Sequence, residues 1–142
     1  IRVCIATDSP ASTPSFDMFD ELRAALAGAR TRERRPDALT AADALELATL
    51  GGARALGLEA EVGSLVPGKQ ADITVLSLEN SPFVPWEDPV TAAVLGGSPE
   101  RVVATLVSGE SRYERGGESW LELIDAAHSA RGRLLSHVAQ TS

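Results

Sequence analysis

Cysteine and histidine are scarce in this sequence, which has one Cys and two His among 142 residues. The single cysteine, Cys4, cannot form an internal disulfide, and it excludes a metal site built from cysteine pairs. Its apolar surroundings predict a small buried side chain. The histidines, His128 and His137, lie in one segment without the spacing of metal ligands. The low cysteine content fits a cytoplasmic protein.

Basic residues and long apolar runs are also scarce. Lys and Arg total 13 against 20 Asp and Glu, and the formal net charge is −7. Because phosphate binding depends on clustered Lys and Arg, we expect neither nucleic acid nor an anionic membrane surface as partner. No apolar stretch approaches the roughly 18 to 20 residues that a membrane span requires.

The first part of the chain predicts a strand, a loop and a helix. The hydrophobic content of 44% is sufficient for a folded core. Residues 1–6 are apolar and rich in β-branched types, and they end at Thr7-Asp8-Ser9-Pro10, which favours a turn. Ser15 is the predicted N-cap of a helix over 16–32, with Phe19, Leu22, Leu26 and Ala29 on its inner face. This order is one unit of an α/β architecture, whose parallel partner strands would precede residue 1.

A second helix is predicted over 41–56. Thr40 and Asp43 form an acidic capping box at its start, and Gly57 ends it. Its predicted inner face consists of Leu45, Ala48, Gly52 and Leu56. Pro67-Gly68 then forms a tight turn before a strand over 71–78. We expect Asp72 to have a structural role, accepting hydrogen bonds from amides around the Gly68 turn.

The last part of the chain combines strands with a final helix. Segment 80–89 is rich in proline and predicts an irregular crossing, while 90–95 fits a helix or a strand equally well. A strand over 101–107 turns at 108–110 into a second strand over 111–114. Ser119 and Glu122 form a capping box for a C-terminal helix.

Three short motifs resemble the amidohydrolase superfamily, in its cytosine-deaminase-like branch of nucleoside deaminases and chlorohydrolases. The first motif is Ala6-Thr7-Asp8-Ser9-Pro10-Ala11-Ser12, which is similar to that branch's motif on the eighth barrel strand. The second is 44–57, similar to the helix that follows the barrel. The third is 63–72, similar to the return into a β-sandwich. Their order and spacing cover about residues 1–115.

The resemblance implies an α/β fold assembled from parts of two domains. Residues 1–60 correspond to the last strand and helix of a (β/α)8 TIM barrel, 61–118 to part of a small β-sandwich domain, and 119–142 to a C-terminal helix. Because the sequence also starts at Ile1 without an initiator Met, we expect it to be the C-terminal piece of a longer protein. Strand 1–6 is then expected to pair with the remainder of the barrel or with another chain.

The resemblance also assigns a role to Asp8. Catalytic residues of such barrels lie at the C-terminal ends of strands, which is where Asp8 lies. In the family, this aspartate binds one divalent metal, zinc or iron, which lowers the pKa of a water molecule to about 7, and it relays a proton towards the leaving amine. Asp8 is therefore the candidate catalytic residue and metal ligand, with capping of the turn as the alternative. Ser9 and Ser12 are candidates for substrate binding, or are turn residues.

These assignments predict that the parent protein is an enzyme, a hydrolytic deaminase of an adenine-bearing nucleoside or a similar small heterocycle. A triazine or other chlorohydrolase, or an imidazolone or amide hydrolase, is the alternative within the superfamily. A non-catalytic structural or assembly fragment is the alternative from another class. Family members take a His-x-His pair and two later histidines from earlier strands, so we expect the 142-residue chain alone to be inactive and metal-free. We expect the parent protein to be a homo-oligomer.

Overall fold

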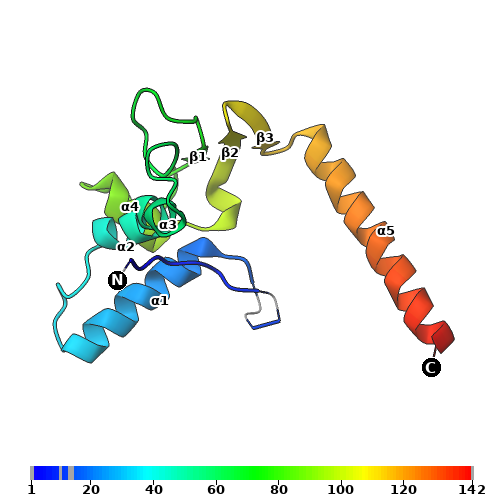
Figure 1. Cartoon of the computed structure of the whole chain (residues 1–142), viewed down its shortest axis with the longest axis horizontal. Helices are drawn as coiled ribbons and strands as arrows, with labels where there is room; N and C mark the ends of the chain where they lie inside the picture. Colours follow the sequence, from blue (N-terminus) through cyan, green and yellow to red (C-terminus); the bar gives the residue numbers. More distant parts are fainter. Residues whose placement is uncertain (1, 10, 13–14, 142) are drawn as a thin grey trace.

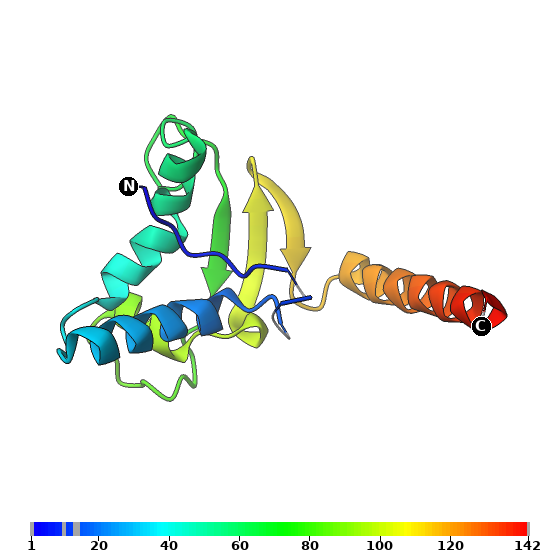
Figure 2. The same ribbon diagram turned by 60° about the horizontal axis from the view of Figure 1, so that its bottom comes forward.

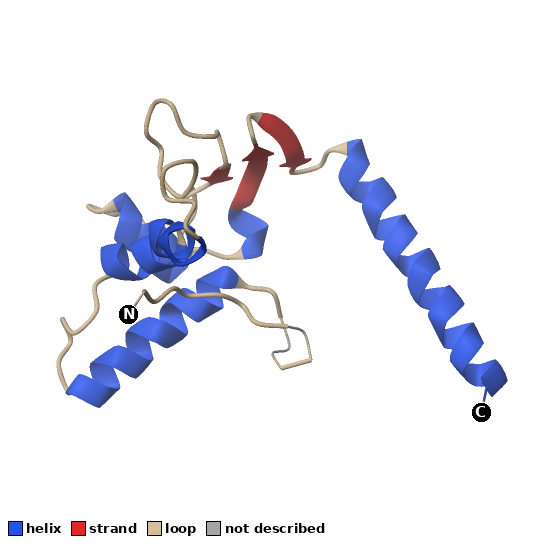
Figure 3. Ribbon diagram, viewed as in Figure 1, coloured by secondary structure: helices blue, strands red, loops and turns tan. Residues whose placement is uncertain are grey.

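The computed structural model describes residues 2–9, 11–12 and 15–141, and within the last helix it describes the side chains of 121–137. The described part has a helical body, a small sheet beside it and a long helix that extends away from both (Figures 1 and 3). The elements in chain order are α1 (Met18–Glu33), α2 (Ala41–Ala48), α3 (Leu50–Leu56), β1 (Ile73–Leu76), α4 (Pro89–Gly96), the 3-10 helix η1 (Pro99–Arg101), β2 (Val102–Val107), β3 (Glu110–Glu114) and α5 (Glu118–Thr141).

The core lies where α1, α2 and α4 pack together. Leu22 and Leu26 of α1 are 3% and 2% exposed, and they meet Ala44 of α2 and Val94 of α4. Leu22 and Leu26 lie on the predicted inner face of α1, which is thereby confirmed. Alanine at position 44 is completely buried, and its small side chain allows the helices to approach closely.

The start of α1 differs from the prediction. The N-cap is Asp17, whose Oδ1 accepts a hydrogen bond from the backbone N–H of Phe19 at 2.8 Å. Ser15 was the predicted cap, and that prediction is wrong by two residues. Asp and Ser cap equally well, so local propensity does not choose between them. In the structure the cap is Asp17, and Arg23 Nη2 lies 4.0 Å from Asp17 Oδ2.

The predicted helix over 41–56 is two helices, α2 and α3, with a break at Thr49. Thr49 has φ −120° and ψ −89°, and its Oγ1 donates to the carbonyl of Leu45 at 2.7 Å. A threonine hydroxyl that bonds the preceding turn competes with regular helix geometry. The break changes the inner face of α3, where Gly51 and Ala53 are buried and Leu56 is 76% exposed. The predicted burial of Leu56 is therefore wrong.

Residues 2–7 are extended but form no β-ladder with any described residue. The strand predicted over 1–6 is absent from the described residues because a strand needs a neighbouring strand to bond its backbone. Figure 2 shows this segment crossing the helical body between α3 and the start of α1. Cys4 is exposed, so the prediction that it is buried is also wrong for this chain.

The sheet has the antiparallel order β1-β2-β3. The predicted hairpin is confirmed: Ser108 (φ 53°) and Gly109 (φ 81°) form the two-residue turn between β2 and β3, which needs positive φ at both positions. The strand predicted over 71–78 forms only at Ile73–Leu76. Asp72 is structural, but its Oδ1 accepts from the N–H of Ser108 at 2.8 Å rather than from the Gly68 turn.

The two remaining helices are α4 and α5. Residues 90–95 are helical, because Asp88 caps α4 by accepting from the N–H groups of Val90 and Thr91, each at 3.0 Å. Helix α5 begins at Glu118, so Ser119 lies inside its first turn and is not the N-cap as predicted. The helix touches the rest of the chain at β3 and extends away from the body (Figures 1 and 2). None of the helices in the described ranges is long and apolar enough to cross a bilayer.

Truncating the core leucine Leu26 to Ala is expected to lower the free energy of unfolding of the chain by about 2 to 5 kcal/mol, because it leaves a cavity between three helices. Leu65→Ala is the matched control, since the same atoms are removed from a side chain that is 77% exposed. The control is expected to change stability by less than about 0.5 kcal/mol. Chemical denaturation checks both values, and equal losses would contradict the placement of the core.

The capping box of α2 predicts a pH dependence. Asp43 Oδ2 accepts from Thr40 Oγ1 at 2.6 Å and from Thr40 N–H at 2.9 Å, and these hydrogen bonds lower the pKa of Asp43. A lowered folded-state pKa stabilises the protein above the unfolded-state pKa, and the contribution is lost as pH falls through the folded-state value.

Asp43→Asn is therefore expected to lower the denaturation midpoint at about pH 7, and this loss is expected to disappear near pH 2. Thr40→Val provides the control, because it removes the largest cause of the shift and should shrink the effect of Asp43→Asn. Denaturant titration of the single and double variants measures this coupling. A loss that is equal at both pH values would show that the carboxylate charge plays no part.

Candidate functional site

Asp8 ends the extended segment and starts the loop that leads to α1. Its φ is 55°, in the left-handed region. Few residues other than glycine adopt this conformation, and Asp and Asn tolerate it best because their short side chains bond locally. The Asp8 side chain is exposed, so the strand-end carboxylate that the sequence predicted is accessible in this chain.

The loop after Asp8 is held by its own hydrogen bonds. Asp8 Oδ1 accepts from the N–H of Ser9 at 2.7 Å, and Ser9 Oγ accepts from the N–H of Ala11 at 3.3 Å. The N–H of Ser12 donates to the carbonyl of Ser9 at 2.9 Å, closing a turn. One carboxylate oxygen of Asp8 thus supports the turn, as the capping alternative requires. A carboxylate has a second oxygen, so this contact is compatible with a ligand role for Oδ2.

A divalent metal would find one suitable ligand in this loop. Carboxylate oxygen is an accepted zinc ligand, but zinc sites use three or four protein ligands. Among the described residues, no group of three His, Cys, Asp or Glu side chains lies close enough together to hold a metal ion. His128 and His137 lie on α5, which extends away from the helical body. The described residues could therefore supply one ligand of such a metal site, the carboxylate of Asp8.

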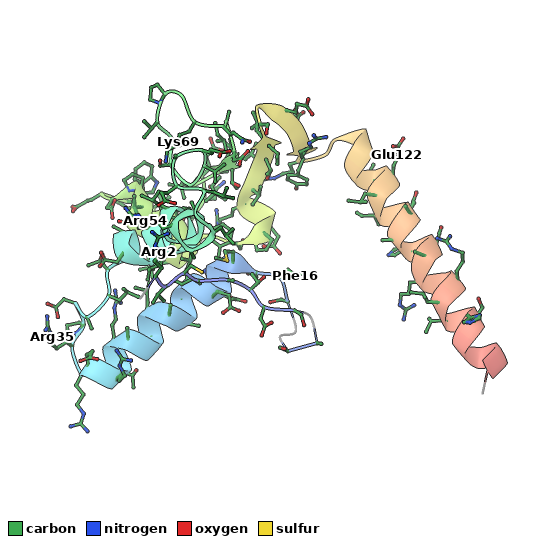
Figure 4. The ribbon with its side chains drawn as sticks, viewed as in Figure 1. Arg2, Phe16, Arg35, Arg54, Lys69 and Glu122 are labelled. Atoms are coloured by element: carbon green, nitrogen blue, oxygen red, sulfur yellow. The ribbon has the colours of Figure 1, made fainter. Side chains whose placement is uncertain are left out.

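The segment that leads to Asp8 is tied to α2 and α3. The N–H of Ile5 donates to the carbonyl of Leu47 at 3.2 Å. Arg2 Nη1 donates to the carbonyl of Arg54 at 2.6 Å, and Arg54 Nη1 meets Glu46 Oε1 at 2.6 Å. Figure 4 shows Arg2 and Arg54 next to each other beside α3. The position of Asp8 relative to the helical body therefore depends on these two helices.

An open cavity of about 520 Å³ lies between the start of this segment and α2 and α3. Arg2, Val3, Leu47 and Gly51 are among its lining residues. The cavity is at the opposite end of the segment from Asp8 and contains no cluster of metal ligands within the described ranges. It is therefore not the candidate active site.

Sequence reasoning located Asp8, Ser9 and Ser12, and the structure places all three in one exposed loop. It missed the break between α2 and α3, to which the segment before Asp8 is hydrogen-bonded. The available signal was the pair Gly51-Gly52 directly after Thr49, since each glycine inside a helix costs about 1 kcal/mol relative to Ala. Two adjacent glycines in a predicted helix indicate a position where a helix ends or another backbone approaches.

The family model for the amidohydrolase family matches residues 1–112. Among curated relatives, the chain is 38% identical over 110 residues to a 5-methylthioadenosine/S-adenosylhomocysteine deaminase of Teredinibacter turnerae, covering 78% of this chain and 25% of that protein. It is 34% identical over 137 residues to a 5'-deoxyadenosine deaminase of Methanothermobacter thermautotrophicus, covering 94% of this chain and 32% of that protein.

Solved structures agree with the sequence matches. An adenosine deaminase from Xanthomonas campestris with bound zinc is similar over 96% of this chain and 32% of its own, with a TM-score of 0.83 and 30% identity. A triazine hydrolase variant is similar over 92% of this chain and 29% of its own, with a TM-score of 0.74 and 29% identity. The chain spans about a quarter to a third of the length of these relatives. From the match over residues 1–112, we conclude that the chain belongs to the amidohydrolase family.

Proposed function

We propose that this chain is the C-terminal part of a metal-dependent enzyme that deaminates an adenine-bearing nucleoside by hydrolysis. The observation that carries the proposal is the position of Asp8, an exposed carboxylate at the end of an extended segment and in front of a helix, inside the region that matches the family model. The relatives named above are deaminases of methylthioadenosine, S-adenosylhomocysteine and 5'-deoxyadenosine. These names support adenine-bearing nucleosides as the substrate class.

The proposal includes an arrangement of domains. Residues 1–60 would be the final strand and helix of a (β/α)8 barrel, 61–118 part of a β-sandwich, and 119–142 a C-terminal helix. The order of extended segment, loop and α1 supports the barrel part, and the antiparallel sheet β1-β2-β3 supports the sandwich part. Residues 2–7 form no β-ladder within the described part of the chain, which supports pairing with further strands of the same barrel, since proteins rarely leave an apolar strand edge open.

Deamination replaces the exocyclic C–NH2 of the ring by C=O, consuming water and releasing ammonia. A new C–O bond forms, the C–N bond breaks, one proton of the attacking water ends on the adjacent ring nitrogen, and the other moves to the leaving amine. Asp8 would accept that proton and pass it on, as general base and then general acid. One divalent metal, zinc or iron, would lower the pKa of water to about 7, with Asp8 as one of its ligands. Zinc is supported by its presence in the adenosine deaminase that resembles this chain.

The hydroxyls of Ser9 and Ser12 are the proposed substrate contacts of this loop. Both residues are exposed and lie within four positions of Asp8. Ser9 Oγ already supports the loop through Ala11 N–H, which favours a loop-shaping role for this residue. Ser12 is the last residue of that turn, and its hydroxyl is the better candidate to meet the nucleoside. We further propose that the enzyme is a homo-oligomer of the cytoplasm.

Deamination is preferred over the hydrolysis of a triazine. A triazine hydrolase variant resembles the chain in structure, but the two curated relatives above are both nucleoside deaminases. The share of the relatives that this chain covers supports an active enzyme only in a longer protein, whose earlier part would supply the remaining metal ligands. The alternative hypothesis, a non-catalytic assembly fragment, is less favoured.

The proposed function predicts that Asp8→Asn in the intact protein lowers kcat by about 10³-fold or more, because the amide can neither accept nor return the proton. The fold is expected to be kept, since Asn tolerates the left-handed backbone of position 8 and can still accept the hydrogen bond from Ser9. Ammonia release from methylthioadenosine and from 5'-deoxyadenosine measures turnover, and circular dichroism checks the fold.

Asp72→Asn is the matched control, because Asp72 is also an exposed carboxylate that accepts a single backbone N–H, that of Ser108. It is expected to keep kcat within about twofold. Retained turnover in Asp8→Asn would rule out the role assigned to Asp8. Equal losses in both variants would mean that the effect is not specific to the site.

A further inference from the structure

The segment that carries Asp8 is hydrogen-bonded to the backbone at the break between α2 and α3. The last carbonyls of a helix have no partner inside it, and α2 ends at Ala48. One of these carbonyls, that of Leu47, accepts the N–H of Ile5 at 3.2 Å. This bond is made three residues before Asp8. The helix break thus provides a backbone acceptor for a segment that forms no ladder within the described residues.

Gly51 lies where two backbone carbonyls, those of Val3 and Glu46, come close to α3. It is buried in the first turn of α3, and a Cβ at this position would lie 3.3 Å from the carbonyl oxygen of Val3 and 3.2 Å from that of Glu46. Both oxygens belong to backbone, which cannot rotate away as a flexible side chain can. A Cβ at position 51 therefore requires the backbone at Val3 or at Glu46 to shift by a few tenths of an ångström, and a larger side chain requires more.

Gly52, the next residue of the same helix, provides a contrast. A Cβ at position 52 would meet nothing within 4 Å. Substitutions at 51 and 52 change the intrinsic helix preference by the same amount, because both residues are glycines inside α3. What differs between the two positions is the contact with the segment that carries Asp8.

We propose that Gly51 is a positioning residue for Asp8: the absence of a side chain at 51 lets residues 2–7 lie against the break between α2 and α3. The bond from Ile5 N–H to the carbonyl of Leu47 and the bond from Arg2 to the carbonyl of Arg54 hold the segment at two points ahead of the loop, and the carbonyl of Val3 lies where a Cβ at 51 would crowd it. Because the segment is extended, a displacement at these points carries Asp8 with it. This inference rests on the proposed function of Asp8.

The test compares Gly51→Val with Gly52→Val in the intact enzyme purified with zinc. Gly51→Val is expected to lower kcat about tenfold or more, since misplacing a catalytic group by 1 Å costs up to about 10²-fold. The KM for methylthioadenosine is expected to stay within about twofold, because Gly51 is not proposed to touch substrate. Competition with a chelator is expected to show zinc binding weakened by about tenfold, as for other residues that orient a metal ligand. Gly52→Val is expected to have the same kcat, KM and zinc affinity as the unsubstituted enzyme.

Two results would overturn the inference. One is equal kcat and zinc affinity in Gly51→Val and Gly52→Val. The other is a loss of thermal stability in Gly51→Val with unchanged kcat per zinc-loaded molecule, which would make Gly51 purely structural. If Gly51→Val does not fold, Gly51→Ala against Gly52→Ala decides in the same way, with an expected loss of about threefold in kcat for position 51.

Failure of this inference is distinguishable from failure of the proposed function. If Asp8→Asn abolishes turnover while the variants at 51 and 52 behave alike, only the role of Gly51 is lost. If Asp8→Asn keeps turnover, the proposed function itself fails, whatever the glycine variants do.

Discussion

The close packing of α1 against α2 and α4 is the interaction on which the rest of this structure depends. Leu26 is buried against Ala44 and Val94, and the small side chain at 44 lets the helices approach closely. Burial of a leucine stabilises a fold by about 1.5 to 3 kcal/mol, more than a hydrogen bond in the exposed loops contributes. With these helices held together, the start of α1 and the break after α2 have fixed positions, and the segment that leads to Asp8 is bonded to the end of α2 through Ile5.

The candidate site follows from that arrangement. Asp8 is at the end of a segment whose backbone is bonded to α2 and α3, and the loop after it is closed by hydrogen bonds of its own residues. One carboxylate is a small part of a metal site, because metal sites collect ligands from several elements that the fold brings together. The proposed partners of Asp8 would come from elements that precede this chain, which is consistent with the share of the relatives that it spans.

Local chemistry was the most predictable part of the fold. The Thr40 and Asp43 capping box and the Ser108-Gly109 hairpin turn depend on neighbouring residues, and the structure contains both. The N-cap of α1 was missed because Ser15 and Asp17 have similar capping propensity. The break at Thr49 was missed because a helix pattern continues through it, and the pattern does not reveal that Thr49 Oγ1 bonds the carbonyl of Leu45.

The sequence by itself determined the family, the position of the candidate carboxylate, the capping box of α2 and the hairpin turn at Ser108-Gly109, because these depend on short motifs and on contacts between residues close in the chain. Only the tertiary structure decided that residues 2–7 form no strand with the described residues, that α2 and α3 separate at Thr49, and that Gly51 rather than Gly52 faces the backbone in front of Asp8. Such features depend on which segments approach one another, and no local pattern encodes a contact between residues 3 and 51.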